Sequence, residues 1–240
     1  MKRELAIVMP VFNEAEGIEE FINEIRFCFR SVNPMFITID DCSTDATWLV
    51  LSEMKKKSDD LILAQNQVNL GHGQSTIRAL KLGLLEKPKY IMSVDGDGQF
   101  LGNELLNFYK TFSSSNSNYA EGNRINRQDP WFRKFISLVT RVMVLAKSGK
   151  KSIDANTPVR IYKAETLENL IENIENTSLV PNLRMSIIVR KIGNEIFTFN
   201  LSNIPRRGSS SQGSSWGSGG TILPSRRLFK FCKKAIKEFL

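Results

Sequence analysis

Two carboxylates on either side of a glycine, close behind an apolar run, are the side chains best suited to chemistry. They are Asp95 and Asp97 in the run Asp95-Gly96-Asp97-Gly98-Gln99, which follows the apolar residues 90–94. The glycines permit a tight turn in which both carboxylates converge on a hard cation such as Mg²⁺ or Mn²⁺. An acidic turn without a ligand fits these residues equally well.

Polar groups also follow two earlier apolar runs. Asp40-Asp41 comes after Met35 to Ile39, and Pro10-Val11-Phe12-Asn13-Glu14 comes after Leu5 to Met9. A carboxylate such as Asp41 can accept hydrogen bonds from a nucleobase or a ribose, although a helix cap explains it as well. Ligands of open α/β sheets bind at the carboxyl ends of strands, so these motifs together predict one binding edge.

The elements that must position these residues alternate between strands and helices, which predicts an α/β fold with a central, mostly parallel sheet flanked by helices. Apolar runs rich in Val and Ile predict the strands, and apolar residues at helical spacing predict the helices. We expect strands at 5–9, 35–39, 61–64, 90–94, 159–163 and 195–201, and helices at 15–30, 45–57, 74–85 and 131–146. Two more helices are expected before and after Pro181.

The three motifs, in this order, resemble those of the family 2 glycosyltransferases, whose fold is GT-A. The sequence looks most like the polyprenyl-phosphate sugar transferases (dolichol-phosphate mannosyltransferase-like), because Gln99 follows the acidic pair and Gly122-Asn123-Arg124 follows a strand. This resemblance implies an inverting, metal-dependent, hexosyltransferase-type transfer from a nucleoside-diphosphate-sugar donor. The implied acceptor is a polyprenyl phosphate or a lipid-linked or cell-surface glycan precursor.

The resemblance also implies roles on the donor side. The helix start Gly71-His72-Gly73-Gln74 suits a donor phosphate or sugar, although by itself it is only a fragment of a GxGxxG pattern. Asp95, Asp97 and Gln99 are the implied ligands of Mg²⁺ or Mn²⁺. The implied nucleotide-sugar-binding residues are Pro10, Phe12, Asn13, Glu14, Asp41, Gly71, Gln74, Asp95 and Gln99.

Arginines further along the chain suit phosphate, because the planar guanidinium donates two parallel hydrogen bonds. The implied acceptor or phosphate ligands are Arg124, Arg133, Arg160 and Arg207. Asp97 and Arg206 are the expected catalytic groups, because charge builds on the leaving diphosphate. A lipid phosphate needs no general base, whereas a sugar hydroxyl does, and Asp154 is then the candidate. Thr157-Pro158-Val159-Arg160 departs from the Ser-Gly-Phe-Arg of the family.

Composition changes after the expected catalytic domain, residues 1–207. Residues 208–225 are rich in Ser and Gly, which predicts a flexible segment, and residues 226–240 would form a basic amphipathic helix. Such a helix favours attachment to an anionic membrane surface, or it docks on the protein's own core. Three cysteines without CxxC spacing favour a reducing compartment. We therefore expect a cytoplasmic protein, peripheral on the inner face of the cytoplasmic membrane.

Two other functions could explain parts of the same sequence. A nucleotidyltransferase that makes a nucleotide sugar would need a basic, glycine-rich loop near the first strand, and residues 11–17 contain no Lys or Arg. A nucleic-acid-binding module would explain the net charge of +8. However, much of the positive excess lies near the end of the sequence instead of alternating with aromatic residues on a sheet, so no nucleic-acid partner is expected.

Overall fold

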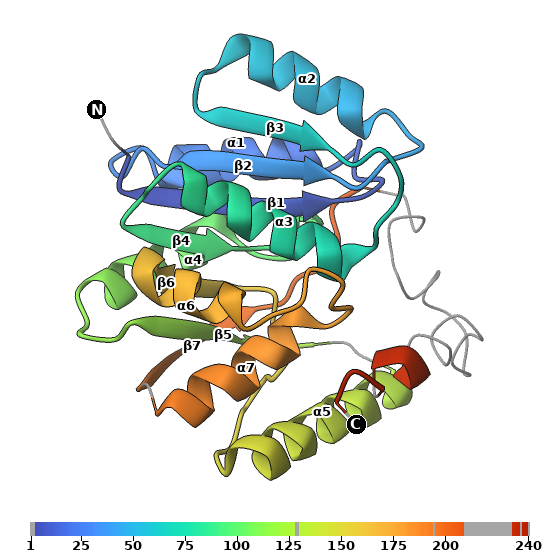
Figure 1. The fold of residues 1–240 in the computed structure, drawn as a ribbon. Helices are drawn as coiled ribbons and strands as arrows, with labels where there is room; N and C mark the ends of the chain where they lie inside the picture. Colours follow the sequence, from blue (N-terminus) through green and yellow to red (C-terminus); the bar gives the residue numbers. More distant parts are fainter. Residues whose placement is uncertain (1–2, 128–129, 194, 209–231, 236, 240) are drawn as a thin grey trace.

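The computed structural model describes residues 3–127, 130–193, 195–208, 232–235 and 237–239 (Figure 1). Its centre is a seven-stranded sheet in the order β3-β2-β1-β4-β6-β5-β7. Neighbouring strands pair in parallel except at β6, which is antiparallel to both β4 and β5. The strands are β1 (Leu5–Val11), β2 (Met35–Asp40), β3 (Leu61–Gln65), β4 (Tyr90–Ser93), β5 (Tyr119–Ile125), β6 (Arg160–Lys163) and β7 (Ile196–Ser202).

Helices cover both faces of the sheet, so a central strand such as β1 is buried along its whole length. Alternate residues of β1 belong to opposite clusters: Leu5 and Ile7 pack with α1, α2 and α4, and Ala6 and Val8 pack with α3, α6 and α7. The helices are α1 (Ile18–Cys28), α2 (Thr47–Lys57), α3 (His72–Leu85), α4 (Gly102–Ser113), α5 (Trp131–Ser148), α6 (Ala164–Glu172) and α7 (Pro181–Ile192).

Helix α5 differs from the others because it lies beside the end of α7 and away from the sheet (Figure 1). Of its 18 residues, Val144 is the one that is fully buried. Val144 belongs to a third, small apolar cluster with residues of α7 and the loop before β6. The helix is therefore held to the domain mainly through α7.

The predicted α/β architecture with a mostly parallel sheet is confirmed. Helix α1 begins three residues later than expected and α2 two residues later, because turns of the site precede both helices. In the turn before α2, the carboxylate of Asp45 accepts the N–H of Thr47 at 2.9 Å. The pattern did not predict α4, and the bounds of β5 were not anticipated. Among the described residues, none of the helices has both the length and the apolar content to cross a bilayer.

The expected segments beyond residue 207 are only partly described. Residues 209–225, expected to be flexible, lie outside the described residues, as do 226–231 of the expected amphipathic helix. Residues 232–235 and 237 are helical, and Ala235 and Phe239 pack against the third apolar cluster. The part of the segment that is described therefore docks on the protein's own core.

Candidate active site

The carboxyl ends of β1, β2 and β4 lie at one edge of the sheet, because these neighbouring strands are parallel. Glu14 follows β1, Asp41 follows β2, and Asp95 follows β4. The structure therefore brings the three sequence motifs to the same edge, as their positions after the strands predicted.

The turn that carries Asp95 and Asp97 depends on its glycines. Gly98 has a φ of +67°, and a Cβ at this position would lie 2.6 Å from Cδ of Arg207. Burial and, after it, the charge of Asp95 raise the pKa of Asp97 to about 7. Two carboxylates that repel each other in this way are stabilised by a shared cation.

A divalent cation fits this pair of carboxylates if other ligands complete its coordination. Mg²⁺ in particular often takes one or two carboxylates together with substrate phosphates and water. Nε2 of His72, at the start of α3, lies 3.6 Å from Oδ1 of Asp95. Within the described ranges, no group of three or more His, Cys, Asp or Glu side chains could hold an ion by itself. The site therefore suits an ion that protein and bound phosphate hold jointly.

Asp41 is buried and its carboxylate organises the loop before α3. Oδ1 accepts the N–H of Leu70 at 2.8 Å and the side-chain amide of Asn66 at 2.6 Å, and Oδ2 accepts the N–H of Gly71 at 2.9 Å. Gly71 has a φ of +87°, which favours glycine. Gln74 lies in the first turn of α3, partly exposed. Asp41 thus shapes the start of α3 through three hydrogen bonds.

The turn after β1 is fastened to the turn after β2. Asn13 has a φ of +55°, and its Oδ1 accepts the N–H of Thr44 at 2.8 Å. The N–H of Glu14 donates to Oγ1 of Thr47 at 2.8 Å. Pro10 lies within β1, and Phe12 is half-buried next to Asn13. These contacts place the carboxylate of Glu14 at the sheet edge.

The segment 203–208 crosses the same edge and carries two of the predicted arginines. Nε of Arg206 donates to Oε2 of Glu14 at 3.0 Å. Arg207 pairs with Glu20 at 2.8 Å and with Glu24, and its guanidinium lies over the ring of Phe21. The side-chain amide of Gln99 donates to the carbonyl of Ile204 at 3.2 Å. Arg207 and Gln99 therefore hold this segment against α1 and the acidic turn.

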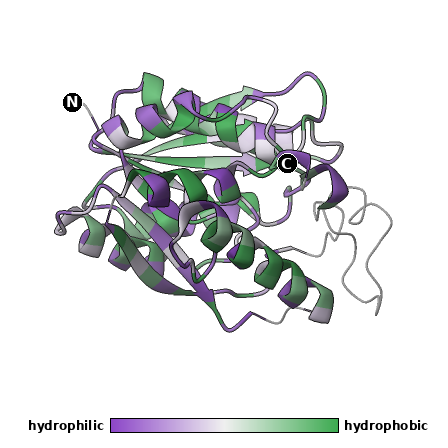
Figure 2. Cartoon of the chain, turned by 60° about the horizontal axis from the view of Figure 1, so that its bottom comes forward, coloured by the Kyte–Doolittle hydropathy of each residue, from purple (hydrophilic) through white to green (hydrophobic). Residues whose placement is uncertain are grey.

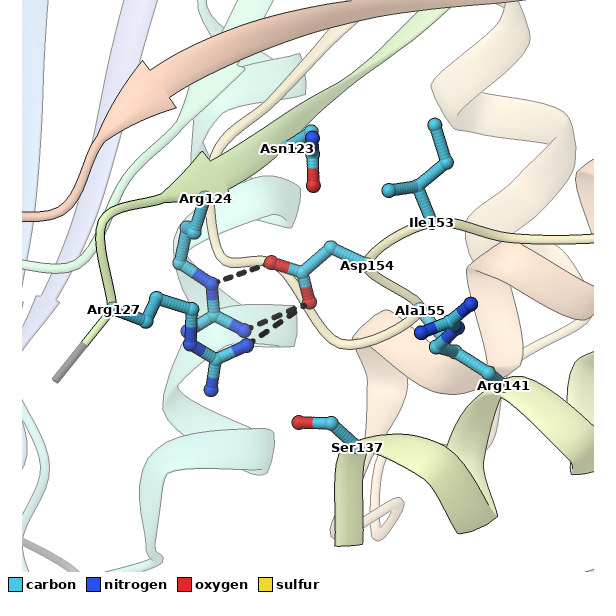
Figure 3. Close-up of a pocket in the computed structure, with 8 residues that line it drawn as sticks. All are labelled: Asn123, Arg124, Arg127, Ser137, Arg141, Ile153, Asp154 and Ala155. Carbon is cyan, nitrogen blue, oxygen red and sulfur yellow. Dashed lines mark hydrogen bonds and ion pairs between the residues drawn. The ribbon is translucent and has the colours of Figure 1, made fainter. Parts of the chain in front are cut away.

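A pocket of about 130 Å³ lies between β5, α5 and the loop before β6 (Figure 3). Arg124 forms two hydrogen bonds with Asp154, at 2.6 and 2.9 Å, and Arg127 lies 3.7 Å from the same carboxylate. Burial alone would raise the pKa of Asp154, but the hydrogen bond and charge of Arg124 and the charge of Arg127 outweigh it, so this pKa is lowered. The lining residues are Asn123, Arg124, Arg127, Ser137, Arg141, Ile153, Asp154 and Ala155.

The charge of this pocket suits an anion, because three arginines face a single carboxylate. The charge of Arg124 also lowers the pKa of Asp97, against the effect of burial, so the pocket and the acidic turn influence each other electrostatically. Sequence reasoning missed Arg127 and Arg141. The signal for Arg141 was its position four residues after Ser137, which puts both on one face of a helix.

Three of the four expected phosphate ligands lie elsewhere. Arg207 pairs with Glu20 and Glu24, as described above, and does not line this pocket. Arg133, on α5, is partly buried and does not line this pocket. Arg160 is fully buried and donates to the carbonyls of Thr157 at 3.0 Å and Ala155 at 3.1 Å, and to Oγ of Ser186 at 3.0 Å. Because its donors are used inside the domain, Arg160 is not retained as a phosphate ligand, and it fixes the loop that carries Asp154.

The model of the Glycosyl transferase family 2 matches residues 6–167, more than half of the chain. A curated relative, undecaprenyl-phosphate 4-deoxy-4-formamido-L-arabinose transferase from Proteus mirabilis, is 25% identical over 195 residues. The match covers 80% of this chain and 59% of that relative, so this chain spans less than two thirds of the relative's length.

Two solved structures share the fold. A mannosyltransferase from Pyrobaculum calidifontis, in complex with GDP-Man and Mn²⁺, has a TM-score of 0.59 at 18% identity, over 85% of this chain and 58% of that one. Glucosyl-3-phosphoglycerate synthase from Mycobacterium tuberculosis, with Mn²⁺, UDP and phosphoglyceric acid, has a TM-score of 0.64 at 13% identity, over 87% of this chain and 72% of that one. With three motifs at one sheet edge and a family match over most of its length, the chain belongs to glycosyl transferase family 2 and is a glycosyltransferase of the GT-A fold.

Proposed function

We propose that this glycosyltransferase transfers a sugar, with inversion, from a nucleoside-diphosphate sugar to a polyprenyl phosphate. The observation that carries the proposal is the arginine-lined pocket, in which Arg124 is bound by Asp154 and carries a charge that also lowers the pKa of Asp97 in the acidic turn. A donor diphosphate at the turn and an acceptor phosphate in the pocket would then both be attracted by this positive charge. The undecaprenyl-phosphate transferase among the relatives supports the class of acceptor.

On the donor side, Asp95 and Asp97 would hold Mg²⁺ or Mn²⁺, which when bound neutralises charge on the leaving diphosphate. Both of the solved structures described above contain Mn²⁺. The loop that Asp41 organises, with Gly71 and Gln74, would face the donor, and the turn of Asn13 and Glu14 would border the nucleotide. Arg206, held in place by Glu14, is the cation we propose to lie beside the diphosphate.

On the acceptor side, an oxygen of the lipid phosphate attacks the anomeric carbon. The new carbon–oxygen bond forms as the bond to the diphosphate breaks, and its electron pair leaves with the diphosphate. Because the attacking oxygen is already anionic, no proton has to be removed. The lowered pKa of Asp154 makes its carboxylate a weak proton acceptor. We therefore assign Asp154 to orienting Arg124 and not to general-base catalysis.

We further propose that residues 1–207 form the catalytic domain and that α5 attaches it to an anionic bilayer. The basic residues of α5 are Arg133, Lys134, Arg141 and Lys147, and the helix contains no Asp or Glu. Figure 2 shows how hydrophobic and hydrophilic residues are distributed over the chain. Its apolar residues that are exposed by 41% to 60% recur every three or four positions: Trp131, Phe135, Leu138, Val142 and Leu145. A helix with one such apolar stripe and only positive charges suits the surface of an acidic membrane.

The donor class is tested by thermal unfolding with UDP, GDP, CDP and dTDP, each with and without Mn²⁺. One nucleotide should raise the melting temperature, and the increase should depend on Mn²⁺ because the carboxylate pair needs phosphate to complete an ion's coordination. Equal shifts with and without the metal would contradict the assignment of Asp95 and Asp97.

The membrane surface is tested by flotation with vesicles. Wild-type protein should float with vesicles that contain about 30% anionic lipid, and the variant Phe135→Ser/Leu138→Ser should lose most of this binding because it interrupts the stripe. The control Leu49→Ser/Leu85→Ser removes two apolar side chains that are exposed elsewhere, on α2 and α3. If both variants float like the wild type, α5 is not the attachment surface.

A further inference from the structure

The described residues of segment 232–239, here called the clasp, bridge α5 and α7. Ala235 and Phe239 pack on the apolar cluster that α5 shares with α7. In Figure 1 the clasp, in red, lies directly beside α5. The buried members of this cluster are Val144, Ala155, Val180, Leu183 and Ile187.

Polar contacts fasten both ends of this bridge. The carboxylate of Glu238, of which 16% is exposed, accepts from the N–H of Leu179 at 2.6 Å and from Oγ of Ser178 at 2.9 Å. It also pairs with Arg184 of α7 at 3.3 Å. Nζ of Lys147 on α5 donates to the carbonyl of Phe239 at 2.9 Å. Glu238 is thus tied to the start of α7, and the next residue is tied to α5.

The position of α5 matters for the pocket, because α5 supplies Ser137 and Arg141 to its lining. The same apolar cluster includes Ala155, the neighbour of Asp154. Helix α5 is held both by its packing on α7, with Val144 fully buried, and by the contacts of the clasp. A change in the clasp therefore alters the lining of the acceptor pocket by shifting α5.

We propose that Glu238 is a positioning residue that keeps α5 in place and so assembles the acceptor pocket. The proposal rests on the proposed function for its effect on catalysis, but its structural part stands on the contacts of the clasp. Glu238 lies outside the set of residues that line the pocket, and its effect passes through α5 and the loop before β6. The donor side should be unaffected.

The test compares Glu238→Gln with Lys234→Gln, which changes an exposed charge on the same segment. A glutamine side chain keeps the shape of Glu238 but cannot accept hydrogen bonds from Leu179 and Arg184 with both of its terminal atoms. Hydrogen exchange over residues 131–148 should become about tenfold faster in Glu238→Gln, while exchange in α1 stays unchanged. The KM for polyprenyl phosphate should rise by about tenfold, with kcat and the affinity for nucleotide within about twofold of wild type.

Each result of the exchange and kinetic measurements either supports or overturns the proposed role of Glu238. Unchanged exchange in α5 overturns the clasp, whatever the enzyme's acceptor is. Faster exchange in α5 together with an equal loss of nucleotide affinity also overturns it, because the effect would then be a general loosening. If exchange in α5 is faster in Glu238→Gln but the wild-type protein transfers no sugar to polyprenyl phosphate, the clasp is supported and the proposed function is refuted instead.

Discussion

Asp97→Asn should reduce sugar transfer to polyprenyl phosphate by on the order of a thousandfold or more, because an amide cannot replace the charge that holds the cation on the leaving diphosphate. The measurement is transfer of labelled sugar from the donor that the nucleotide comparison identifies, with Mn²⁺ at saturation. Asp59→Asn is the matched control, since Asp59 is exposed in the turn between α2 and β3. Turnover of Asp97→Asn near that of the control would remove the metal role.

The stability of Asp97→Asn separates lost chemistry from lost folding. The pKa of Asp97 is raised in the folded protein, from the ordinary 3.8 to about 7, so its carboxylate costs the wild-type fold stability as the pH rises through this window. Asparagine has no such cost. Without metal, the melting temperature of the variant minus that of the wild type should therefore increase from about pH 4 to about pH 7 and then level off. A decrease would contradict the raised pKa.

Local pattern predicted the parts of the fold that depend on neighbouring residues. All seven residues of β1 are buried, so an uninterrupted apolar run was sufficient to identify it. The Asp95-Gly96-Asp97-Gly98 turn was equally predictable from its glycines, and Gly98 has a positive φ, although the side chains that surround both glycines come from distant segments. The order of strands and helices also predicted that the three motifs lie at one edge of the sheet.

The roles of single charged residues could not be predicted in this way, because their partners are distant in sequence. Arg207 is held by Glu20 and Glu24, which precede it by 187 and 183 residues. Arg160 is enclosed by residues from three separate segments: β5, the loop before β6, and α7. An arginine that binds phosphate and one that is buried in an ion pair have the same local sequence, and only the tertiary contacts distinguish them.

The contacts of amphipathic helices are equally hard to predict from sequence, because they too depend on distant residues. Both α5 and the segment 226–240 carry apolar and basic residues, and the sequence favoured the latter for membrane contact. In the structure, Phe239 of that segment packs on the domain, whereas Phe135 of α5 is 60% exposed. Periodicity identifies an apolar face but does not say what covers it.

Arg124→Lys should lower kcat/KM for polyprenyl phosphate by about 10-fold to 100-fold, because lysine keeps the charge and loses the planar fork that Asp154 orients. Arg124→Ala should lower it by more than about a hundredfold, since the charge is lost as well. Nucleotide affinity at about pH 8 should change little in Arg124→Lys, because the positive charge that lowers the pKa of Asp97 is kept. The matched control is Arg30→Ala, which removes an exposed guanidinium just beyond α1.

The pH dependence of the same variants decides whether Arg124 joins the two halves of the site. Its charge lowers the pKa of Asp97, so Arg124→Ala should raise that pKa further. Because the cation needs the deprotonated carboxylate, Mn²⁺-dependent nucleotide binding should require a higher pH in Arg124→Ala than in Arg124→Lys or the wild type. If the three pH profiles coincide, the charge of Arg124 does not act on the acidic turn, and Arg124 serves the acceptor phosphate alone.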